Sequence, residues 1–300
     1  MLQRLHSIFA PEVNLDIEAV TAHLVARGVP VPRLIRTTDD RAWVIDDGHT
    51  WRALTFVDGE TVHRVPGPEW AEQGGELVGR MHRALADLEH SYAFARQGVH
   101  DTAAHLAKLT DCTRMNTTMR EHAEARDLGE DILAVARELP AMPATPRRHC
   151  HGDLKISNIL FSRSPVRATA IVDLDTVGLS TIAYELGDAM RSWCNPKGED
   201  AGSVTFDLAI FEAAIRSFRS VVGDRVSTDE LRSIAIGLET VTVELAARFC
   251  VDVFLDNYFG WDSTRFPSRR AHNFVRARGQ LALARAIRDS RDAALQIVLG

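Results

Sequence analysis

The fold of this 300-residue chain is decided by His151-Gly152-Asp153-Leu154-Lys155-Ile156-Ser157-Asn158, which is followed fifteen residues later by Asp173-Leu174-Asp175. Apolar and β-branched residues between them, over 159–161 and 168–172, predict two short strands. Neighbouring antiparallel strands return the chain on itself. We therefore expect the loop before the first strand and the residue that ends the second strand to face one cleft.

Four side chains of this region match the needs of phosphoryl transfer. A carboxylate must orient or accept the proton of the attacking hydroxyl, and hard oxygen ligands must hold Mg²⁺ against the phosphates of ATP. Asp153 can supply the first, Asn158 and Asp173 the second, and Lys155 a cation near the transferring group. We predict that Asp153 and Lys155 are catalytic and that Asn158 and Asp173 are the metal ligands. The alternative is a loop whose polar residues only cap and turn the chain.

The rest of the chain predicts a small part with strands, followed by a large helical part. Apolar residues at steps of three and four predict a helix over 14–27, and two segments at 42–46 and 50–57 flank Asp46-Asp47-Gly48, which is a hairpin signal. The boundary is expected near residues 57–68. Beyond it, periodic patterns predict helices at about 69–90, 120–139, 183–193, 206–222, 229–258 and 269–297. The expected fold class is α+β.

The loop has the H-x-D-L-K-x-x-N spacing of the protein-kinase catalytic loop, although no Asp-Phe-Gly or Ala-Pro-Glu segment of a protein kinase is present. The sequence resembles the aminoglycoside-phosphotransferase and choline-kinase superfamily. Supporting segments are Gly79-Arg80-Met81-His82 and Tyr184-Glu185-Leu186-Gly187-Asp188, in which Glu185 stands where Asp is usual. The resemblance implies a protein-kinase-like two-lobe fold. It implies a partial N-lobe over residues 1–60 and a helical C-lobe with the catalytic loop over 61–300.

Within the superfamily, the nearest likeness is to N-acetylhexosamine 1-kinase-like proteins. It is carried by Leu2 to Leu5, by Ile171 to Val177, by Gly187 to Arg191 and by His272 to Leu281. This likeness implies an ATP-dependent enzyme that phosphorylates a sugar hydroxyl. The candidate substrate-binding residues are Asp175, Arg191, Arg276 and Arg278.

Other acceptors stay open at this point. For Arg276 and Arg278, the alternative to substrate binding is a position on the solvated face of an amphipathic helix. A choline-type or aminoglycoside-type acceptor would be cationic and would favour an acidic and aromatic pocket, for which residues 252–262 are candidates. A degenerate, non-catalytic binding module is the alternative from another functional class.

The kinase elements that grip the nucleotide phosphates are missing from the start of the sequence. No glycine precedes Gly28, so the glycine-rich loop is missing, and Met1 to Arg4 resembles the end of the strand that carries the ATP-binding lysine. Arg4, or alternatively Gln3, falls at the lysine position and Glu18 at the position of its ion-pair partner, so we expect an Arg4–Glu18 pair at the cofactor. A start further upstream would explain the missing loop, and degeneration is the alternative.

Composition and charge exclude several classes of function. The formal net charge is −6 and the pI is near 6.1, which argues against a nucleic-acid-binding protein. No apolar run is long enough to cross a membrane. The four cysteines form no C-x-x-C pair, so neither a zinc site nor a disulfide framework is expected. A cytoplasmic location is expected instead. Cys150 beside His151 is interpreted as a buried thiol, not as a nucleophile with its base. The oligomeric state is open.

Overall fold

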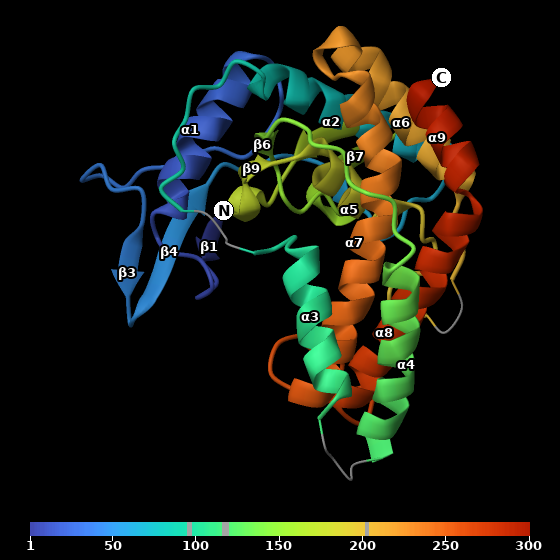
Figure 1. Cartoon of the computed structure of the whole chain (residues 1–300). Helices are drawn as coiled ribbons and strands as arrows, with labels where there is room; N and C mark the ends of the chain where they lie inside the picture. The colour runs from blue at the N-terminus through green and yellow to red at the C-terminus, as the bar shows by residue number, and fades with distance from the viewer. Residues whose placement is uncertain (95–97, 116–119, 202–203) are drawn as a thin grey trace.

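The computed structural model describes residues 1–94, 98–115, 120–201 and 204–300. Its first part is a small antiparallel sheet with one helix, α1 (Val13–Ala26). The strand at the centre of this sheet, β4 (His49–Leu54), pairs with β1 (Leu2–Arg4), β2 (Leu34–Ile35) and β3 (Val44–Asp46). Figure 1 shows α1 and this sheet together on one side of the molecule. The expected helix at 14–27 and the hairpin around Asp46 to Gly48 are confirmed.

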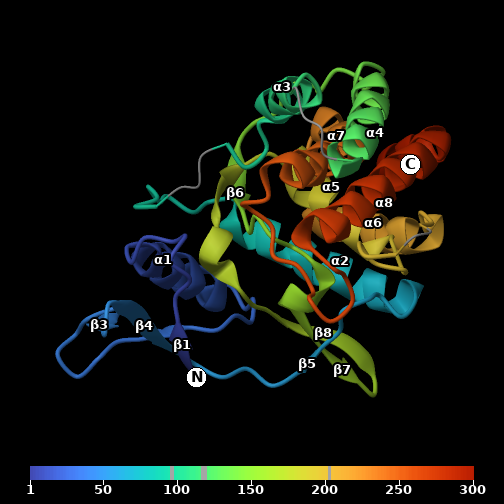
Figure 2. The same cartoon turned by 90° about the horizontal axis from the view of Figure 1, so that it is seen from below.

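Two further small sheets surround the loop that contains Asp153. β5 (Glu60–Thr61) pairs with β7 (Ile159–Arg163), and β7 pairs with β8 (Val166–Ile171), so the two strands expected after the motif are present. β6 (Arg148–Cys150) pairs with β9 (Gly178–Ser180). In Figure 2 the strands β5, β7 and β8 lie on the same side of the molecule as β1 and β4, while α3 and α4 lie opposite.

Helices make up most of the remaining chain. They are α2 (Pro68–Leu85), α3 (Thr102–Thr113), α4 (Arg120–Ala136), α5 (Ile182–Trp193), α6 (Leu208–Val222), α7 (Thr228–Leu255), α8 (Arg269–Asp289) and α9 (Arg291–Leu299). The sequence analysis did not predict α3, which buries only Leu109, Cys112 and Thr113. The single helix expected at 269–297 is divided at Ser290 into α8 and α9.

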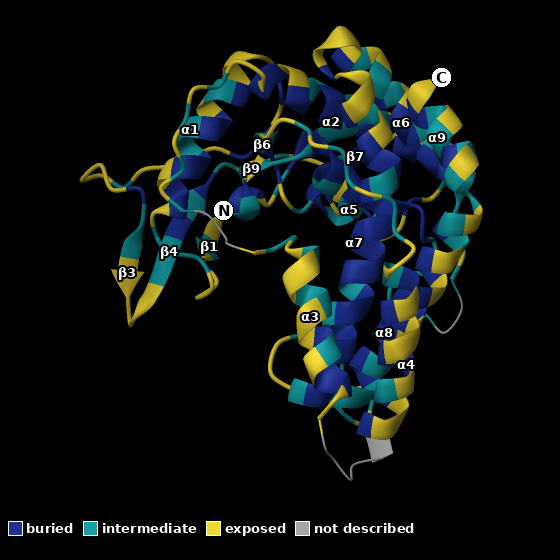
Figure 3. Ribbon diagram, viewed as in Figure 1, coloured by how far each residue is buried: buried dark blue, intermediate teal, exposed yellow. Residues whose placement is uncertain are grey.

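The helix α7 forms the axis of the helical part. It is buried along most of its length, as Figure 3 shows, and it packs against α3, α4, α5, α8 and α9. It crosses α5 where two glycines meet: a Cβ at Gly237 would lie 2.1 Å from the carbonyl oxygen of Ala183, and one at Gly187 2.7 Å from the carbonyl carbon of Gly237. Because no side chain fits between the two backbones, α5 is fixed against α7. This contact positions Glu185 of α5 beneath the loop described below.

Apolar side chains form two core clusters. One joins α1, α2, β7, α5 and α6, and the other lies between α3, α4, α7 and α8. Among the described residues, no helix is both long and apolar enough to cross a membrane. The expected α+β architecture, with a small strand-containing part and a large helical part, is confirmed.

Candidate active site

The loop His151–Asn158 is tied to the end of β8 through Val172. The backbone N–H of Val172 donates to the carbonyl oxygen of Asn158 at 2.9 Å, and the carbonyl oxygen of Val172 lies 2.9 Å from Nε2 of His151. Since His151 is completely buried, its ring is fixed between the loop and the strand. These two contacts bring Asp173, the next residue after Val172, beside the loop.

The four side chains predicted from the motif lie together. The ammonium of Lys155 is 2.7 Å from Oδ2 of Asp153 and 3.9 Å from Oδ2 of Asp173. The amide of Asn158 donates to the carbonyl oxygen of Asp153 at 2.7 Å and to its Oδ2 at 3.3 Å. Partial burial alone would lower the pKa of Lys155, but the carboxylates of Asp153 and Asp173 outweigh it and raise that pKa above its ordinary value. The lysine is therefore a cation at neutral pH.

Two backbone conformations at the site are special. Gly152 has a φ of 82°, and a Cβ there would lie 2.6 Å from the carbonyl oxygen of Thr176, so only glycine fits. Asp173 has a φ of 67°, which is uncommon for a residue other than glycine. The left-handed backbone conformation of Asp173 is a local strain, and such strain is often found at functional sites.

Glu185 supports the loop from below. Its buried carboxylate accepts the backbone N–H of His151 at 2.7 Å and that of Gly152 at 2.8 Å. Burial would raise the pKa of Glu185, but the neighbouring His82 and His151 and the N–H of Gly152 hold it below its ordinary value. The longer side chain at this position therefore reaches the loop where the superfamily pattern has Asp.

We expect Glu185→Gln to lower the free energy of unfolding by about 1–3 kcal/mol near neutral pH, because its NH2 group replaces one of the two oxygens that accept the N–H groups of His151 and Gly152. The folded-state pKa of Glu185 is depressed, so its carboxylate stabilises the fold above the ordinary pKa of glutamate, and this contribution is lost as the pH falls through the folded-state value. The difference between variant and wild type should therefore shrink below about pH 4. Urea unfolding across this pH range measures it.

The matched control is Glu72→Gln on the exposed face of α2. It should change the free energy of unfolding by less than about 0.5 kcal/mol at any pH. Equal stability of Glu185→Gln and wild type near neutral pH would contradict the supporting role of Glu185.

The described residues contain no group of three or more His, Cys, Asp or Glu side chains that could hold a metal ion alone. Magnesium is commonly bound by one or two carboxylates together with substrate phosphates and water. Asp173 and Asn158 offer a hard oxygen donor set of that kind, and the half-exposed side chain of Asp173 is open to a ligand. The residues present therefore fit a magnesium ion shared with a nucleotide.

The expected Arg4–Glu18 pair is wrong. Glu18 binds Arg36 instead, with Oε2 at 2.6 Å from Nη2, and the arginine lowers the pKa of that carboxyl. Side chains alternate along a strand, so Arg4 lies on the opposite face of β1 from its neighbour Gln3. Gln3 points toward the interior, where its Oε1 accepts a hydrogen bond from Nη2 of Arg52 at 2.9 Å. Arg4 itself is exposed.

Arg52 of β4 is a functional candidate that the sequence did not reveal. Its side chain is 2% exposed, and Nη2 lies 2.6 Å from Oδ1 of Asp175. Asp175 was expected to bind the substrate, but it binds Arg52 and lines neither of the cavities beside the loop. Burial raises the pKa of the Asp175 carboxyl, and Arg52 opposes that shift. The pair therefore joins the small sheet to the segment that carries Asp173.

A cavity of about 510 Å³ opens beside Asp153 and Lys155. Two of the predicted substrate residues, Arg191 and Arg276, line it, whereas Arg278 is exposed on α8 and does not. Carboxylates fix both arginines: Asp188 and Glu199 bind Arg191 at 2.8 and 2.6 Å, and Asp200 binds Arg276 at 2.9 Å. The sequence analysis did not identify Glu199 or Asp200. The volume suits a small-molecule ligand.

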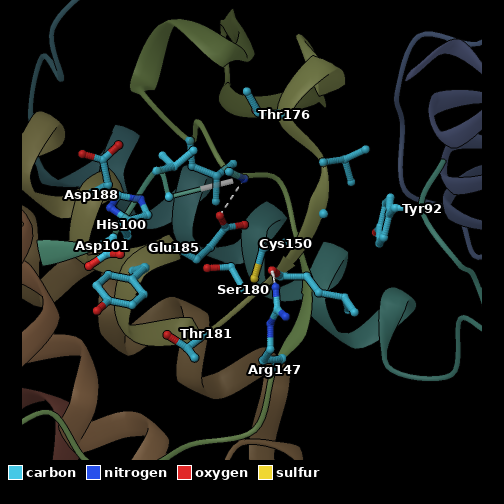
Figure 4. A pocket seen from close by; sticks show the side chains of 18 of the residues that line it. Tyr92, His100, Asp101, Arg147, Cys150, Thr176, Ser180, Thr181, Glu185 and Asp188 are labelled. Atoms are coloured by element: carbon cyan, nitrogen blue, oxygen red, sulfur yellow. Dashed lines mark hydrogen bonds between the residues drawn. The ribbon is translucent and has the colours of Figure 1, made fainter. Parts of the chain in front are cut away.

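A second cavity, of about 880 Å³, lies on the other side of the loop. Figure 4 shows His100, Asp101 and Asp188 on one side of it and Tyr92 on the other. Cys150 belongs to its lining, and burial raises the pKa of this thiol well above its ordinary value. The interpretation of Cys150 as a buried, unreactive thiol is therefore supported.

One carboxylate of the acidic and aromatic segment 252–262 serves the local fold. Asp252 is 2% exposed, and its carboxylate accepts the backbone N–H groups of Asn257, Tyr258 and Phe259. Its role is to hold the chain as it leaves α7. Neither cavity beside the loop is lined by a residue of this segment.

The sequence of this chain is similar to a known protein family and to a curated kinase. A sequence model of the family described as "Phosphotransferase enzyme family" matches residues 4–218. Homoserine kinase of Methylobacterium nodulans is 25% identical over 202 residues, a match that covers 66% of this chain and 57% of that protein. The chain thus spans less than two thirds of the length of this curated relative.

Two solved structures have a similar fold at low identity. The microcompartment-associated aminopropanol kinase is 15% identical, with a TM-score of 0.62 over 97% of this chain and 86% of that chain. Amicoumacin kinase hAmiN, in complex with AMP-PNP, Ca²⁺ and Ami, is 13% identical, with a TM-score of 0.61 over 94% of this chain and 80% of that chain. At such identities the likeness shows the fold, and the predicted kinase-like α+β fold is confirmed.

Proposed function

Because this chain belongs to the phosphotransferase enzyme family, we propose that it transfers the terminal phosphoryl group of ATP to a hydroxyl group of a small molecule. The observation that carries the proposal is the position of Lys155, whose ammonium is 2.7 Å from Asp153 and 3.9 Å from Asp173. Phosphoryl transfer needs a carboxylate for the nucleophile and another for the metal, close to a site for the acceptor. The cavity beside Asp153 offers that site.

In this proposal Asp153 accepts a hydrogen bond from the acceptor hydroxyl and takes its proton as the hydroxyl oxygen bonds to the γ-phosphorus. The bond from that phosphorus to the bridging oxygen breaks, and ADP leaves with the electron pair. Lys155 offsets negative charge on the transferring group. Magnesium held by Asp173 and Asn158 would add positive charge against the phosphates. Arg4, which is exposed on β1, is our candidate for a further phosphate contact.

For the acceptor we propose a sugar of the N-acetylhexosamine type. The sequence segments that resemble sugar 1-kinases support it, and so does the polar lining of the cavity, which suits a ligand rich in hydroxyl groups. Arg191 and Arg276 would be its contacts in that cavity. The relative named homoserine kinase and the neighbour named aminopropanol kinase favour an amino alcohol as the second candidate.

The test is ADP release from MgATP with a panel of acceptors: N-acetylglucosamine, N-acetylgalactosamine, homoserine, choline and kanamycin. We expect a sugar to stimulate ADP release, with the phosphorylated sugar as product. Stimulation by homoserine or choline alone would replace the sugar by an amino alcohol. Tight ATP binding without turnover on any acceptor would identify a non-catalytic binding module and would overturn the proposed activity.

A further inference from the structure

The lining of the cavity beside Asp153 is richer in basic than in acidic side chains. The protein carries a formal net charge of −6. Yet the described lining of this cavity contains six lysine and arginine side chains and three carboxylates. The basic residues are Arg64, Lys155, Arg191, Lys197, Arg265 and Arg276, and the acidic ones are Asp153, Glu199 and Asp200.

Ion pairs among the described residues offset most of this excess but do not involve Arg64. Asp200 alone is shared by Arg276 at 2.9 Å and by Arg265 at 3.2 Å, and it also binds His272 at 2.8 Å. Arg191 is bound by Glu199, which belongs to the lining, and by Asp188, which does not. The carboxylate of Asp188 therefore also counts against the basic excess of the cavity. Lys155 likewise contacts Asp173 at 3.9 Å, so a second carboxylate from outside the lining counts against the basic excess.

Arg64 is the basic residue that is placed to meet a ligand. It comes from the segment between β5 and α2, it is exposed, and no described residue forms an ion pair with it. Its guanidinium reaches the loop that follows α5, since a Cβ at Gly198 would lie 3.9 Å from Nη2. Arg64 lines the same cavity as Arg191 and Arg276, and its charge is available to a bound molecule.

Apart from Lys155, which is 3.9 Å from Asp173, these cations line the part of the site that we assign to the acceptor. The cavity lining includes Asp153 and Lys155 but neither Asn158 nor Asp173. A nucleotide whose phosphates contact Asn158 and Asp173 would therefore leave this cavity to the second substrate.

We propose that the acceptor carries an anionic group, a phosphate or a carboxylate, which binds at Arg64 while its hydroxyl lies at Asp153. This inference rests on the proposed phosphotransferase function and narrows its acceptor to an anionic sugar derivative. It excludes cationic acceptors such as aminoglycosides and choline. Arginine is well suited to the role, because its planar fork matches the oxygens of both anions.

The test measures binding by calorimetric titration of four sugars at one ionic strength: N-acetylglucosamine, N-acetylglucosamine 6-phosphate, glucuronate and glucosamine. We expect the two anions to bind at least about tenfold more tightly than the neutral and cationic sugars. Arg64→Glu should weaken binding of the anions about tenfold or more and leave that of N-acetylglucosamine and of an ATP analogue unchanged. Tighter binding of only the phosphate or only the carboxylate identifies which anion the site takes.

The matched control is Arg83→Glu, the same charge reversal at an exposed position of α2 away from the cavity. It should leave the preference for anions intact. Three results would overturn the inference: glucosamine or N-acetylglucosamine binds as tightly as the anions, Arg64→Glu behaves like Arg83→Glu, or neither anion binds up to about 10 mM.

ADP release with the same four sugars separates this inference from the proposed activity. Turnover of the neutral sugar alone would keep the phosphotransferase and discard the anionic acceptor. Arg64-dependent binding of anions without turnover of any sugar would keep the anion site and discard the phosphotransferase.

Discussion

Asp153→Asn is expected to lower kcat by about 10²–10⁴-fold, because the amide cannot take the proton of the acceptor hydroxyl. The substitution keeps the size of the side chain, and the contacts of its neighbours Lys155 and Asn158 restrict its rearrangement. The KM for ATP should change little, since Asp153 is placed on the acceptor side of the site. Initial rates of ADP release at saturating MgATP, with an acceptor identified by the panel, measure the effect.

Asp289→Asn is the control for this variant. Asp289 is exposed at the end of α8, so removal of its charge should leave kcat within about twofold of the wild type. A decrease of kcat by less than about tenfold in Asp153→Asn would contradict the role of Asp153 as the proton acceptor.

Arg52→Met is expected to produce the largest loss of stability, about 3–5 kcal/mol. Arg52 is buried, and its guanidinium contacts Gln3, Asn14 and Asp175. Without it, the buried carboxylate of Asp175 has lost its cation, and an uncompensated charge in the interior is costly. Chemical unfolding followed by circular dichroism measures the free energy difference.

A double variant shows whether the charge causes the loss. Arg52→Met combined with Asp175→Asn removes both charges, so it should be more stable than Arg52→Met alone. Arg33→Met, at an exposed position before β2, should stay within about 0.5 kcal/mol of the wild type. A double variant that is less stable than Arg52→Met would contradict the explanation.

The sequence predicted those parts of the molecule whose signal is local. The loop from His151 to Asn158, the two strands after it and Asp173 all lie within one short stretch, so their residue types and spacing predicted that they meet. The helices with a clear apolar period, such as α1 and α6, were predicted within a few residues. The role of Glu185 could be inferred from family likeness, and the contacts with His151 and Gly152 give it a physical basis.

Features that depend on contacts between distant parts of the chain were not predicted. Arg52 and Asp175 are far apart in sequence, and an arginine in a strand gives no sign of its partner. The expected Arg4–Glu18 pair was wrong because a shift of one residue along β1 moves a side chain to the other face. The charge of the acceptor cavity depends on four separate segments that only the fold brings together.

The Arg52–Asp175 contact also has a mechanical consequence. It ties the central strand of the small sheet to a residue two positions beyond Asp173. If the sheet moves away from the helices, one possibility is that the ion pair breaks and leaves two unpaired charges in the interior, which is costly. The other is that the ion pair persists and displaces the Asp173 carboxylate. In the second case, separation of the small sheet from the helical part would also disrupt the proposed magnesium site at Asp173.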